Sequence, residues 1–400
     1  MGMNDTPSGE RLHIALFGKR NAGKSSLINA ITGQDLAVVS EIKGTTTDPV
    51  SKAMELLPLG PVVMIDTPGL DDSGALGDLR VKKAFQVLNK ADIALLVVDA
   101  QEGFSPDDQR ILERIKAKSI PYIIVMNKSD LVSEAGKADD HTIWVSSTTK
   151  ENIHQLKELI AHSVRPEGEG KRVVGDLIKQ DDVIVLVVPV DKAAPKGRLI
   201  LPQQQTIRDI LDTQATAVVC QNTTLAATLK TLNKKPAMVI TDSQVFAEVS
   251  KIVPDDIPLT SFSILFARYK GNLALAVKGV AALKSLEDGD TVLVSEGCTH
   301  HRQCGDIGSV KIPRWIAQNT GKKINIELSS GTEFPADLSK YKLVVHCGGC
   351  MLNEREMKYR LRCAEDEGVP ITNYGILIAY VTGILKRSVA LFHDIAALLD

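Results

Sequence analysis

Apolar and polar positions follow two periods along the chain, one typical of strands and one typical of helices. Between residues 12 and 160, five short apolar runs are separated by stretches with helical periodicity: LHIALFG, VVMIDTPG, IALLVVDA, PYIIVMNKSD and TIWVSS. Runs of this length between amphipathic helices are typical of βαβ units. The pattern therefore predicts a mostly parallel sheet wrapped by helices.

The stretch RPEGEGKR at residues 165–172 interrupts this alternation. It is charged, contains Pro and Gly and has no hydrophobic period, so we interpret it as a linker. A second α/β series follows, with strands expected at residues 183–188, 215–220, 237–241 and 259–264. This series has no glycine-rich loop and one isolated cysteine, Cys220, which favours a structural or dimerising role.

A third series begins with the amphipathic stretch at residues 273–286. Strands are expected at residues 291–295, 324–328, 342–346 and 371–374, followed by a long terminal helix. The chain is thus predicted to be an α/β protein with three domains, at residues 1–168, 169–264 and 265–400. The second and third are expected to be smaller α/β domains.

Composition narrows the classes of protein to consider. The chain has 400 residues, which is long enough for two or three domains with their own cores. Its net charge of −2 gives no field that would gather nucleic acid, and its apolar runs are shorter than a bilayer crossing requires. No secretion leader is evident, so we expect a soluble protein of the reducing cytoplasm. Six cysteines there indicate metal or redox chemistry rather than disulfides.

The first candidate site is a phosphate-binding loop. GKRNAGKSS fits the pattern G-x-x-x-x-G-K-S from Gly18 to Ser25, after a predicted strand and before a predicted helix. Backbone N–H groups of such a loop surround a phosphate, while Lys24 adds a cation and the Ser25 hydroxyl joins the shell of a Mg²⁺ ion. The residues expected to contact the nucleotide here are Gly18, Asn21, Ala22, Gly23, Lys24, Ser25 and Ser26.

Three further motifs follow, each directly after a predicted strand. DTPG offers the Asp66 carboxylate toward Mg²⁺ and the Gly69 N–H toward the γ-phosphate. NKSD offers a carboxylate that accepts both N–H donors of guanine, which adenine would leave unpaired, and SST offers backbone N–H groups to the guanine oxygen. The predicted base-binding residues are Asn127, Lys128, Asp130, Ser146, Ser147 and Thr148. Each motif alone is also an ordinary turn or helix cap, but in this order they define a guanine-nucleotide site.

Residues 10–165 resemble the translation-factor-type GTPases, in the branch related to the tRNA-modification GTPase and Era. The resemblance implies a P-loop GTPase domain that binds GTP with Mg²⁺, and it implies that Lys24, Thr46, Asp66 and Gly69 serve hydrolysis. Thr46, in the stretch GTTTD, matches the threonine that closes over Mg²⁺ when GTP is bound. Its neighbours Thr45 and Thr47 are alternatives for that role.

The chain departs from Ras-type GTPases directly after Gly69. Those proteins carry a glutamine there that orients the attacking water, whereas this chain has Leu70, Asp71 and Asp72. Unaided hydrolysis is therefore expected to be slow. Asn21 resembles the asparagine that helps to bind a catalytic K⁺ in relatives without that glutamine, and it fits equally well as a loop residue that tolerates an unusual backbone angle.

The second candidate site is a cluster of thiols near the carboxyl ends of predicted strands. The sequence reads CTHHRQC from Cys298 to Cys304 and HCGGC from His346 to Cys350. A C-x-x-C turn brings two thiolates to one metal or cluster, and Cys298 supplies a third sulfur. A redox disulfide leaves this third cysteine unexplained. Structural zinc with His300 or His346, and a three-cysteine iron–sulfur cubane, fit the spacing equally well.

A GTPase of this branch, followed by a plain α/β segment and by C-x-H and H-C-x-x-C, resembles the HydF family of [FeFe]-hydrogenase maturation GTPases. The resemblance covers the whole chain and implies domains for GTP hydrolysis, dimerisation and cluster binding. It implies a [4Fe–4S] cluster on Cys298, Cys347 and Cys350, with a fourth ligand among His300, His346 and Asp306. Cys304 lies outside this signature and is interpreted as a non-ligand.

The same resemblance implies a function and partners. The protein would be a homodimeric scaffold that carries a diiron subcluster, assembled with two radical S-adenosylmethionine maturases, to the apo-hydrogenase. One alternative is a tRNA-modification or ribosome-assembly GTPase related to Era with a structural zinc module, which the near-neutral charge disfavours. Another is an electron-transfer protein whose cluster is only redox-active.

Overall fold

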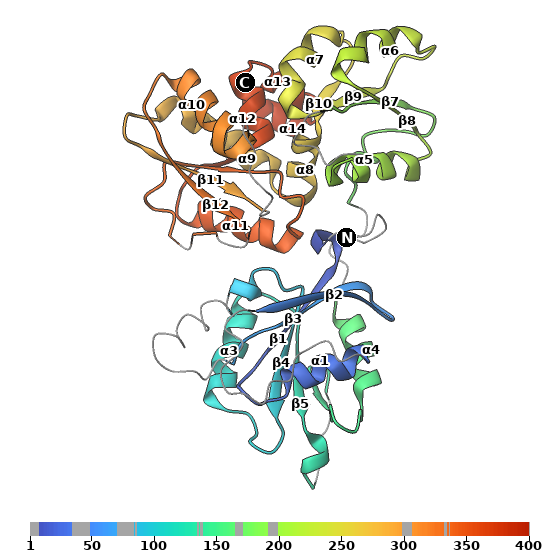
Figure 1. Ribbon diagram of the computed structural model, residues 1–400, viewed down its shortest axis with the longest axis vertical. Coiled ribbons are helices and arrows are strands. Elements are labelled where there is room, and N and C mark those ends of the chain that lie inside the picture. The colour runs from blue at the N-terminus through green and yellow to red at the C-terminus, as the bar shows by residue number, and fades with distance from the viewer. Residues whose placement is uncertain are drawn as a thin grey trace. The chain divides into compact units, whose positions relative to one another are not determined.

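The computed structural model describes most of the chain: residues 8–33, 49–69, 84, 86–133, 136, 139–164, 171–190, 199–297, 306–331, 334–335 and 337–399. The chain divides into two compact units, Met1–Glu169 and Gly170–Asp400 (Figure 1). Each unit has its own buried apolar core. Within the described residues, no helix combines the length and the apolarity that crossing a bilayer requires.

The first unit contains a six-stranded sheet in the order β2-β3-β1-β4-β5-β6, in which β2 alone runs antiparallel to its neighbour. Its strands are β1 (Leu12–Phe17), β2 (Val50–Leu56), β3 (Gly60–Asp66), β4 (Ile93–Asp99), β5 (Tyr122–Asn127) and β6 (Thr142–Trp144). Its helices include α1 (Lys24–Thr32), α3 (Pro106–Ala117) and α4 (Ile153–Ser163). Strand β4 is buried along six of its seven residues, as expected for a parallel strand with helices on both faces. The predicted mostly parallel sheet is confirmed.

The second unit contains two four-stranded, fully parallel sheets, β10-β9-β7-β8 and β12-β11-β13-β14. The first consists of β7 (Val183–Val187), β8 (Thr216–Cys220), β9 (Met238–Thr241) and β10 (Leu259–Ser261). The second consists of β11 (Thr291–Glu296), β12 (Asn325–Ser330), β13 (Leu343–His346) and β14 (Ile371–Asn373). The helices are α5 (Leu201–Asp212), α6 (Leu225–Thr231), α7 (Phe246–Ile252), α8 (Phe262–Lys270), α9 (Leu273–Val280), α10 (Ile312–Thr320), α11 (Glu354–Asp366), α12 (Tyr374–Val381), α13 (Leu385–Val389) and α14 (His393–Ala396).

A common apolar core joins these two sheets. It contains Val185 of β7 and Val292 of β11, and helix α12 supplies Ile376 and Leu377, all of them fully buried. Figure 1 shows α8, α9 and α12 in the space between the sheets. Helix α12 is apolar on nearly all sides, which fits its position inside the unit.

Two predictions for this unit were wrong. The strand expected at residues 259–264 ends at Ser261, because the Ser261 hydroxyl accepts a hydrogen bond from the Ile264 N–H (3.3 Å) and begins α8. The long terminal helix is divided into α12, α13 and α14. Gly383, at φ +76°, ends the first of them, and the Ile384 N–H returns to the Ala379 carbonyl (2.9 Å).

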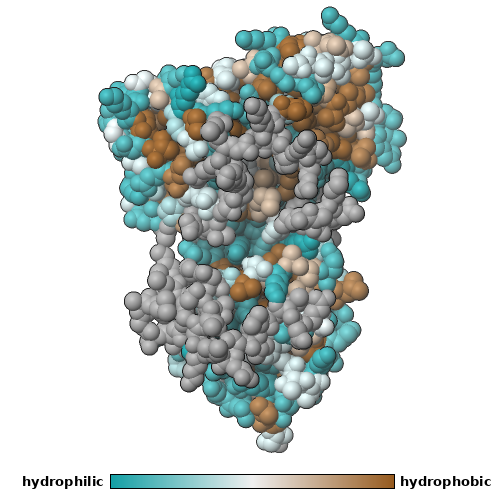
Figure 2. Space-filling model, in the orientation of Figure 1, coloured by the Kyte–Doolittle hydropathy of each residue, from teal (hydrophilic) through white to brown (hydrophobic). Residues whose placement is uncertain are grey.

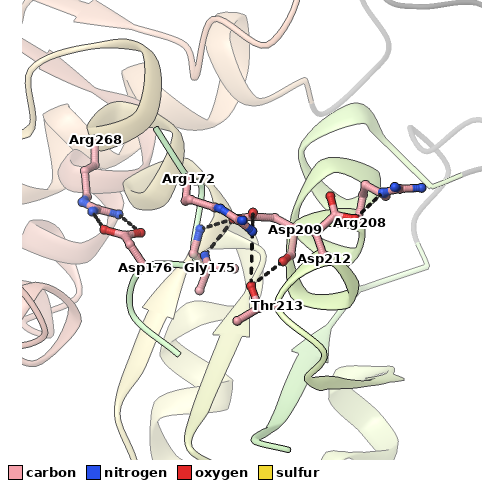
Figure 3. Close-up of polar contacts among 9 residues, drawn as sticks. Arg172, Gly175, Asp176, Arg208, Asp209, Asp212, Thr213 and Arg268 are labelled. Atoms are coloured by element: carbon pink, nitrogen blue, oxygen red, sulfur yellow. Dashed lines mark hydrogen bonds and ion pairs between the residues drawn. The ribbon is translucent and has the colours of Figure 1, made fainter. Parts of the chain in front are cut away.

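The segment after the predicted linker is fixed to α5 and α8 (Figure 3). The Asp209 carboxylate of α5 accepts hydrogen bonds from the N–H groups of Val174 (2.8 Å) and Gly175 (2.7 Å). Asp176 forms a two-point ion pair with Arg268 of α8. Residues 171–176 are therefore held to both helices from the point where the described chain resumes.

The turn from β1 to α1 depends on two glycines in unusual conformations. Gly18 has φ +144°, and a Cβ atom there would lie 2.2 Å from the Val97 carbonyl oxygen. Gly23 has φ +88°, and a Cβ atom there would lie 2.3 Å from the Asn127 amide nitrogen. The Val97 backbone cannot move aside as the Asn127 side chain could. A side chain should therefore be tolerated less well at Gly18 than at Gly23.

We therefore expect Gly18→Ala to destabilise the first unit by about 3 kcal/mol or more and to lower its melting temperature by roughly 6 °C or more. Gly33→Ala is the matched control, because Gly33 also has a positive φ (+68°) but has open space around its Cβ position. The control should cost only ~1 kcal/mol, the price of the left-handed conformation alone. Thermal unfolding followed by circular dichroism tests the pair, and equal losses would contradict the steric explanation.

Candidate functional sites

The phosphate-binding loop is arranged around the Lys24 ammonium group. Lys24 is the first residue of α1, is 8% exposed, and donates hydrogen bonds to the carbonyls of Gly18 (3.0 Å) and Lys19 (2.7 Å). Asn21 lies in the same loop with a left-handed φ of +62°. The loop therefore presents a helix N-terminus and a buried cation together, which is the arrangement that binds phosphate groups.

A candidate magnesium site lies between α1 and the end of β3. The Ser25 hydroxyl donates to one Asp66 oxygen at 2.5 Å. The other Asp66 oxygen, Oδ1, is buried and has no hydrogen-bond partner among the described residues. Burial raises the pKa of Asp66, and the Ser25 hydrogen bond and the Lys24 charge only partly offset it. A buried carboxylate oxygen of this kind, beside a hydroxyl, fits the oxygen shell that Mg²⁺ prefers.

Asn127 connects the phosphate loop to the predicted base-binding motifs. Its side chain is buried and donates to the Ala22 carbonyl (3.0 Å). Its oxygen accepts hydrogen bonds from the N–H (3.1 Å) and the hydroxyl (2.7 Å) of Ser147. The asparagine therefore sets the spacing between three loops that the sequence places far apart.

The rest of the base-binding region follows β5 and β6. Lys128 is left-handed (φ +64°) and forms an ion pair with Asp99 (2.5 Å), a residue that the motifs did not identify. Asp130 is exposed in a short 3-10 turn, Ser129–Leu131, with its carboxylate at the surface. Ser146 is fully buried and its hydroxyl accepts from the Thr149 N–H (3.0 Å). The structure thus collects the predicted guanine-binding motifs at the carboxyl ends of neighbouring strands.

The other residues predicted for the nucleotide site are located as follows. Gly69 is the last described residue of the DTPG motif, and Thr148 is exposed after β6. Ser26 lies in the first turn of α1. Thr46 lies outside the described residues, as do Leu70, Asp71 and Asp72.

The thiol site begins where β11 and β13 end side by side. Their parallel register pairs Ser295 with His346, which sets Cys347 level with Glu296 and close to Gly297. The Cys347 sulfur accepts hydrogen bonds from the N–H groups of Gly297 (3.1 Å) and Gly349 (3.4 Å). Hydrogen-bond donors of this kind stabilise a thiolate, and hydrogen bonds to sulfur are among the factors that set the reduction potential of an iron–sulfur cluster. Cys298 follows Gly297 directly and lies outside the described residues, with His300 and Cys304.

Cys350 completes the turn and lies in a drier environment. Burial raises the pKa of its thiol, and the positive charge of Lys270 partly opposes this. Lys270 also donates hydrogen bonds to the carbonyls of Cys350 (3.2 Å) and Leu352 (3.1 Å). Within the described residues, no three His, Cys, Asp or Glu side chains converge on one point. The described pair of thiols, with N–H donors aimed at sulfur, nevertheless has the donor chemistry of an iron–sulfur or zinc ligand set.

His346 is oriented away from a ligand role by two hydrogen bonds. Arg360 donates to its Nε2 atom (3.1 Å), and because a guanidinium cannot accept, Nδ1 carries the proton and donates to the Cys347 carbonyl (2.7 Å). Burial first, and then the Arg360 charge, lower the pKa of His346 to about 3. Both ring nitrogens of this neutral histidine are therefore engaged, and the side chain supports the Cys347 backbone.

Asp306, the third predicted candidate, begins a π-helix at Ile307–Lys311. One of its carboxylate oxygens accepts from the Ser309 N–H (2.9 Å) and hydroxyl (2.9 Å). π-Helical turns occur often at functional sites. Near this turn, the Tyr374 hydroxyl donates to the buried Glu296 carboxylate (3.2 Å), and burial raises the pKa of Tyr374.

Two buried cations near the thiol loop, Arg360 and Lys270, were not identified by the sequence motifs. Arg360 of α11 is fully buried, forms an ion pair with Glu356 (2.9 Å) and donates to the Gly331 carbonyl (2.6 Å). Lys270 is 4% exposed at the end of α8. Fully buried charged side chains are rare unless they are paired. Arg360 and Lys270 therefore mark a region in which positive charge is held away from water. The sequence did not predict that these two side chains are buried, because each lies in a charged or amphipathic helix where a surface position is the ordinary expectation.

The motifs and geometry of the first unit agree with comparisons with known proteins. Residues 13–128 match the domain model of the 50S ribosome-binding GTPases. The tRNA modification GTPase MnmE of Legionella pneumophila (strain Corby) is 41% identical over 160 residues, which cover 39% of this chain and 35% of that protein. GTPase Der of Kosmotoga olearia is 41% identical over 195 residues, 48% of this chain and 42% of that protein. The matched region spans about a third of the length of the MnmE relatives.

A solved structure, Aquifex aeolicus Era bound to GDP·AlF4⁻, has 23% sequence identity to this chain and a TM-score of 0.36. The match covers 52% of this chain and 91% of that one. The family match and the curated relatives establish that the first unit is a P-loop GTPase domain.

The second unit matches two models that are specific to one family. Residues 173–271 match the hydrogen maturase F dimerization domain, and residues 274–391 match the hydrogen maturase F tetramerization domain. Together these matches cover more than half of the chain, and their descriptions indicate self-association. With the GTPase domain before them, they establish that the chain belongs to the hydrogen maturase F (HydF) family.

Proposed function

We propose that this chain is a GTP-hydrolysing scaffold that binds a [4Fe–4S] cluster and delivers a diiron subcluster precursor to apo-[FeFe]-hydrogenase. The observation that carries the proposal is the parallel pairing of β11 with β13, which sets the Cys347 thiol beside the residue that precedes Cys298. The family membership supplies the link to hydrogenase maturation. Two radical S-adenosylmethionine maturases would act as further partners, and the reducing cytoplasm would suit a site built from free thiols.

Cys298, Cys347 and Cys350 are the proposed cluster ligands. The two N–H donors aimed at the Cys347 sulfur favour its thiolate form, and the partial burial of Cys350 limits access of water to the site. When bound, a three-cysteine cubane would supply one iron with a replaceable fourth ligand, as a carrier requires. His346 fits that fourth position poorly because both of its ring nitrogens are engaged, which leaves His300 and Asp306 as candidates.

The GTPase unit would act as the nucleotide-dependent part of the carrier. Ser25 and Asp66 would hold Mg²⁺, with Thr46 as a further ligand, while Lys24 and the Gly69 N–H would bind the γ-phosphate. Mg²⁺ supplies charge neutralisation between the β- and γ-phosphates when bound. Contacts of the switch segments with the γ-phosphate would then bias partner association.

The alternative, an RNA-modification or ribosome-assembly GTPase with structural zinc, has weaker support. The MnmE relatives match about 40% of this chain, whereas the two HydF models match residues 173–271 and 274–391. The net charge of −2 also gives no basis for attraction to RNA.

The metal content of anaerobically purified protein tests the cluster. We expect a brown protein with iron and sulfide, and we expect Cys298→Ser, Cys347→Ser and Cys350→Ser each to lose most of the iron, since each removes one of three sulfur ligands. Cys220→Ser is the matched control, because Cys220 also ends a parallel strand, β8, in the other sheet of the unit. Colourless, zinc-rich protein would reject the cluster in favour of structural zinc.

Delivery needs a second measurement. Protein loaded with a diiron unit that carries CO, cyanide and dithiolate ligands is mixed with apo-hydrogenase, and hydrogen evolution is followed. Activation supports a carrier. A cluster-containing protein that never activates the hydrogenase would instead be an electron-transfer protein.

Potassium dependence tests the role of Asn21. If its left-handed position helps to hold a K⁺ beside the phosphates, GTP hydrolysis should be at least about tenfold faster in KCl than in NaCl, because a fixed cation stabilises the charge that develops on the leaving group. Asn21→Ala should remove that difference and leave folding intact. Equal rates in the two salts would assign Asn21 to loop geometry alone.

Self-association is expected through the open edge of the first sheet in the second unit. Strand β8 is an edge strand, and Val219 on it is 47% exposed. Leu211 of the neighbouring α5 is 57% exposed, and Figure 2 shows apolar surface over this part of the unit. An edge strand with exposed apolar side chains is a template for pairing with a second copy. We propose a homodimer that forms here, through the middle segment of the chain.

Val219→Lys should therefore convert the dimer to a monomer, since a charge on an edge strand opposes pairing. Size-exclusion chromatography with light scattering measures the mass. Leu57→Lys, at an 82% exposed position between β2 and β3, is the control and should leave the mass unchanged. A Val219→Lys protein that stays dimeric would move the interface elsewhere.

A further inference from the structure

Lys270 is a buried lysine whose ammonium lies against the backbone of the thiol loop. It is the last residue of α8 and is 4% exposed. Its Nζ atom donates to the Cys350 carbonyl (3.2 Å) and to the Leu352 carbonyl (3.1 Å). The two acceptors flank Met351, so one side chain fixes the backbone on both sides of the residue that follows the second thiol.

The position of Lys270 is set by the last turn of α8. Two residues earlier, Arg268 forms the two-point ion pair with Asp176 that Figure 3 shows. Residues at i and i+2 point to different sides of a helix, so α8 uses one side to hold residues 171–176 and another to hold the thiol loop. The carboxyl end of a helix also favours a cation, which reduces the cost of burying Lys270 there.

A buried ammonium group is costly unless it is hydrogen-bonded. Two of the groups that satisfy it belong to the loop that carries Cys350, at separations of 80 and 82 residues in sequence. Loss of the lysine would leave buried carbonyls to be satisfied by water or by a shift of the loop. The loop geometry and the lysine are therefore mutually dependent.

We propose that Lys270 is a positioning residue of the cluster loop, which holds Cys350 in place for cluster binding and raises the reduction potential of the bound cluster. The inference rests on the proposed function, because it assumes that Cys347 and Cys350 are cluster ligands. Reduction adds a negative charge to the cluster, and a fixed cation in a medium of low dielectric stabilises the added charge.

Two substitutions separate the hydrogen bonds from the charge. Lys270→Gln keeps a donor and removes the charge, so it should bind the cluster but shift the midpoint potential downward. The expected shift corresponds to about a tenfold change in the reduction equilibrium, or ~59 mV for one electron. Lys270→Met removes both properties, so it should also lose more than half of the reconstituted iron. Lys251→Met is the matched control, because Lys251 is the last-turn lysine of α7 and is exposed.

The full-length variants are reconstituted anaerobically with iron and sulfide, then compared by iron content, electron paramagnetic resonance of the reduced state and potentiometric titration. Circular dichroism checks that they are folded. Wild-type potential and iron content in both Lys270 variants would overturn the proposal, while the proposed function would survive. Two unfolded variants would also overturn it, since Lys270 would then be a residue of the general core. A wild-type protein that binds no cluster would instead reject the proposed function.

Discussion

The parallel pairing of β11 with β13 is the constraint on which the thiol site depends. Because Ser295 lies opposite His346, the two strands end within one residue of each other, and the loops that follow them begin side by side. A slip of β13 by one residue in this register would turn His346 to the opposite face of the sheet and would separate Gly297 from the Cys347 sulfur. The register is secured by the fully buried Val292, Val294 and Val345, which pack in the common core of the unit.

The buried Arg360 side chain, acting through His346, fixes the backbone conformation at the start of the loop that carries the two thiols. Arg360 fixes His346, and His346 fixes the Cys347 carbonyl, so the beginning of the loop is set by a chain of two hydrogen bonds. Such networks contribute little net stability, but breaking one leaves an uncompensated buried charge at a cost of about 3–5 kcal/mol. The network is therefore better explained by the specific loop conformation that it imposes than by the stability of the unit. Gly349, at φ +63°, supplies the turn that this conformation requires.

Sequence patterns predicted the parts of the structure that depend on local residues. The order of the strands and of the phosphate-loop motifs could be predicted because each motif directly follows an apolar run. Both thiol loops were expected at strand ends because open α/β sheets bind ligands at the carboxyl ends of their strands. The break of the terminal helix at Gly383 and the cap at Ser261 were also local signals, but the apolar periodicity masked them. Lys270 and Arg360 could not be predicted, because their roles come from partners that the fold alone brings near.

Residues 171–176, at the start of the second unit, are tied to three of its helices by contacts of different strength. Lys171 pairs with Glu354 at the start of α11, and Asp176 pairs with Arg268 of α8, but these pairs are partly exposed, and each contributes only about 0–1 kcal/mol. The Asp209 carboxylate is better shielded and receives two backbone N–H groups, and charge-assisted bonds of this kind are roughly twice as strong as neutral ones. A displacement of residues 171–176 would therefore break the ties to α8 and α11 before it released α5. Since α5 packs beside β8, the firmest contact of residues 171–176 ties them to the edge strand of the first sheet of this unit rather than to the thiol loop.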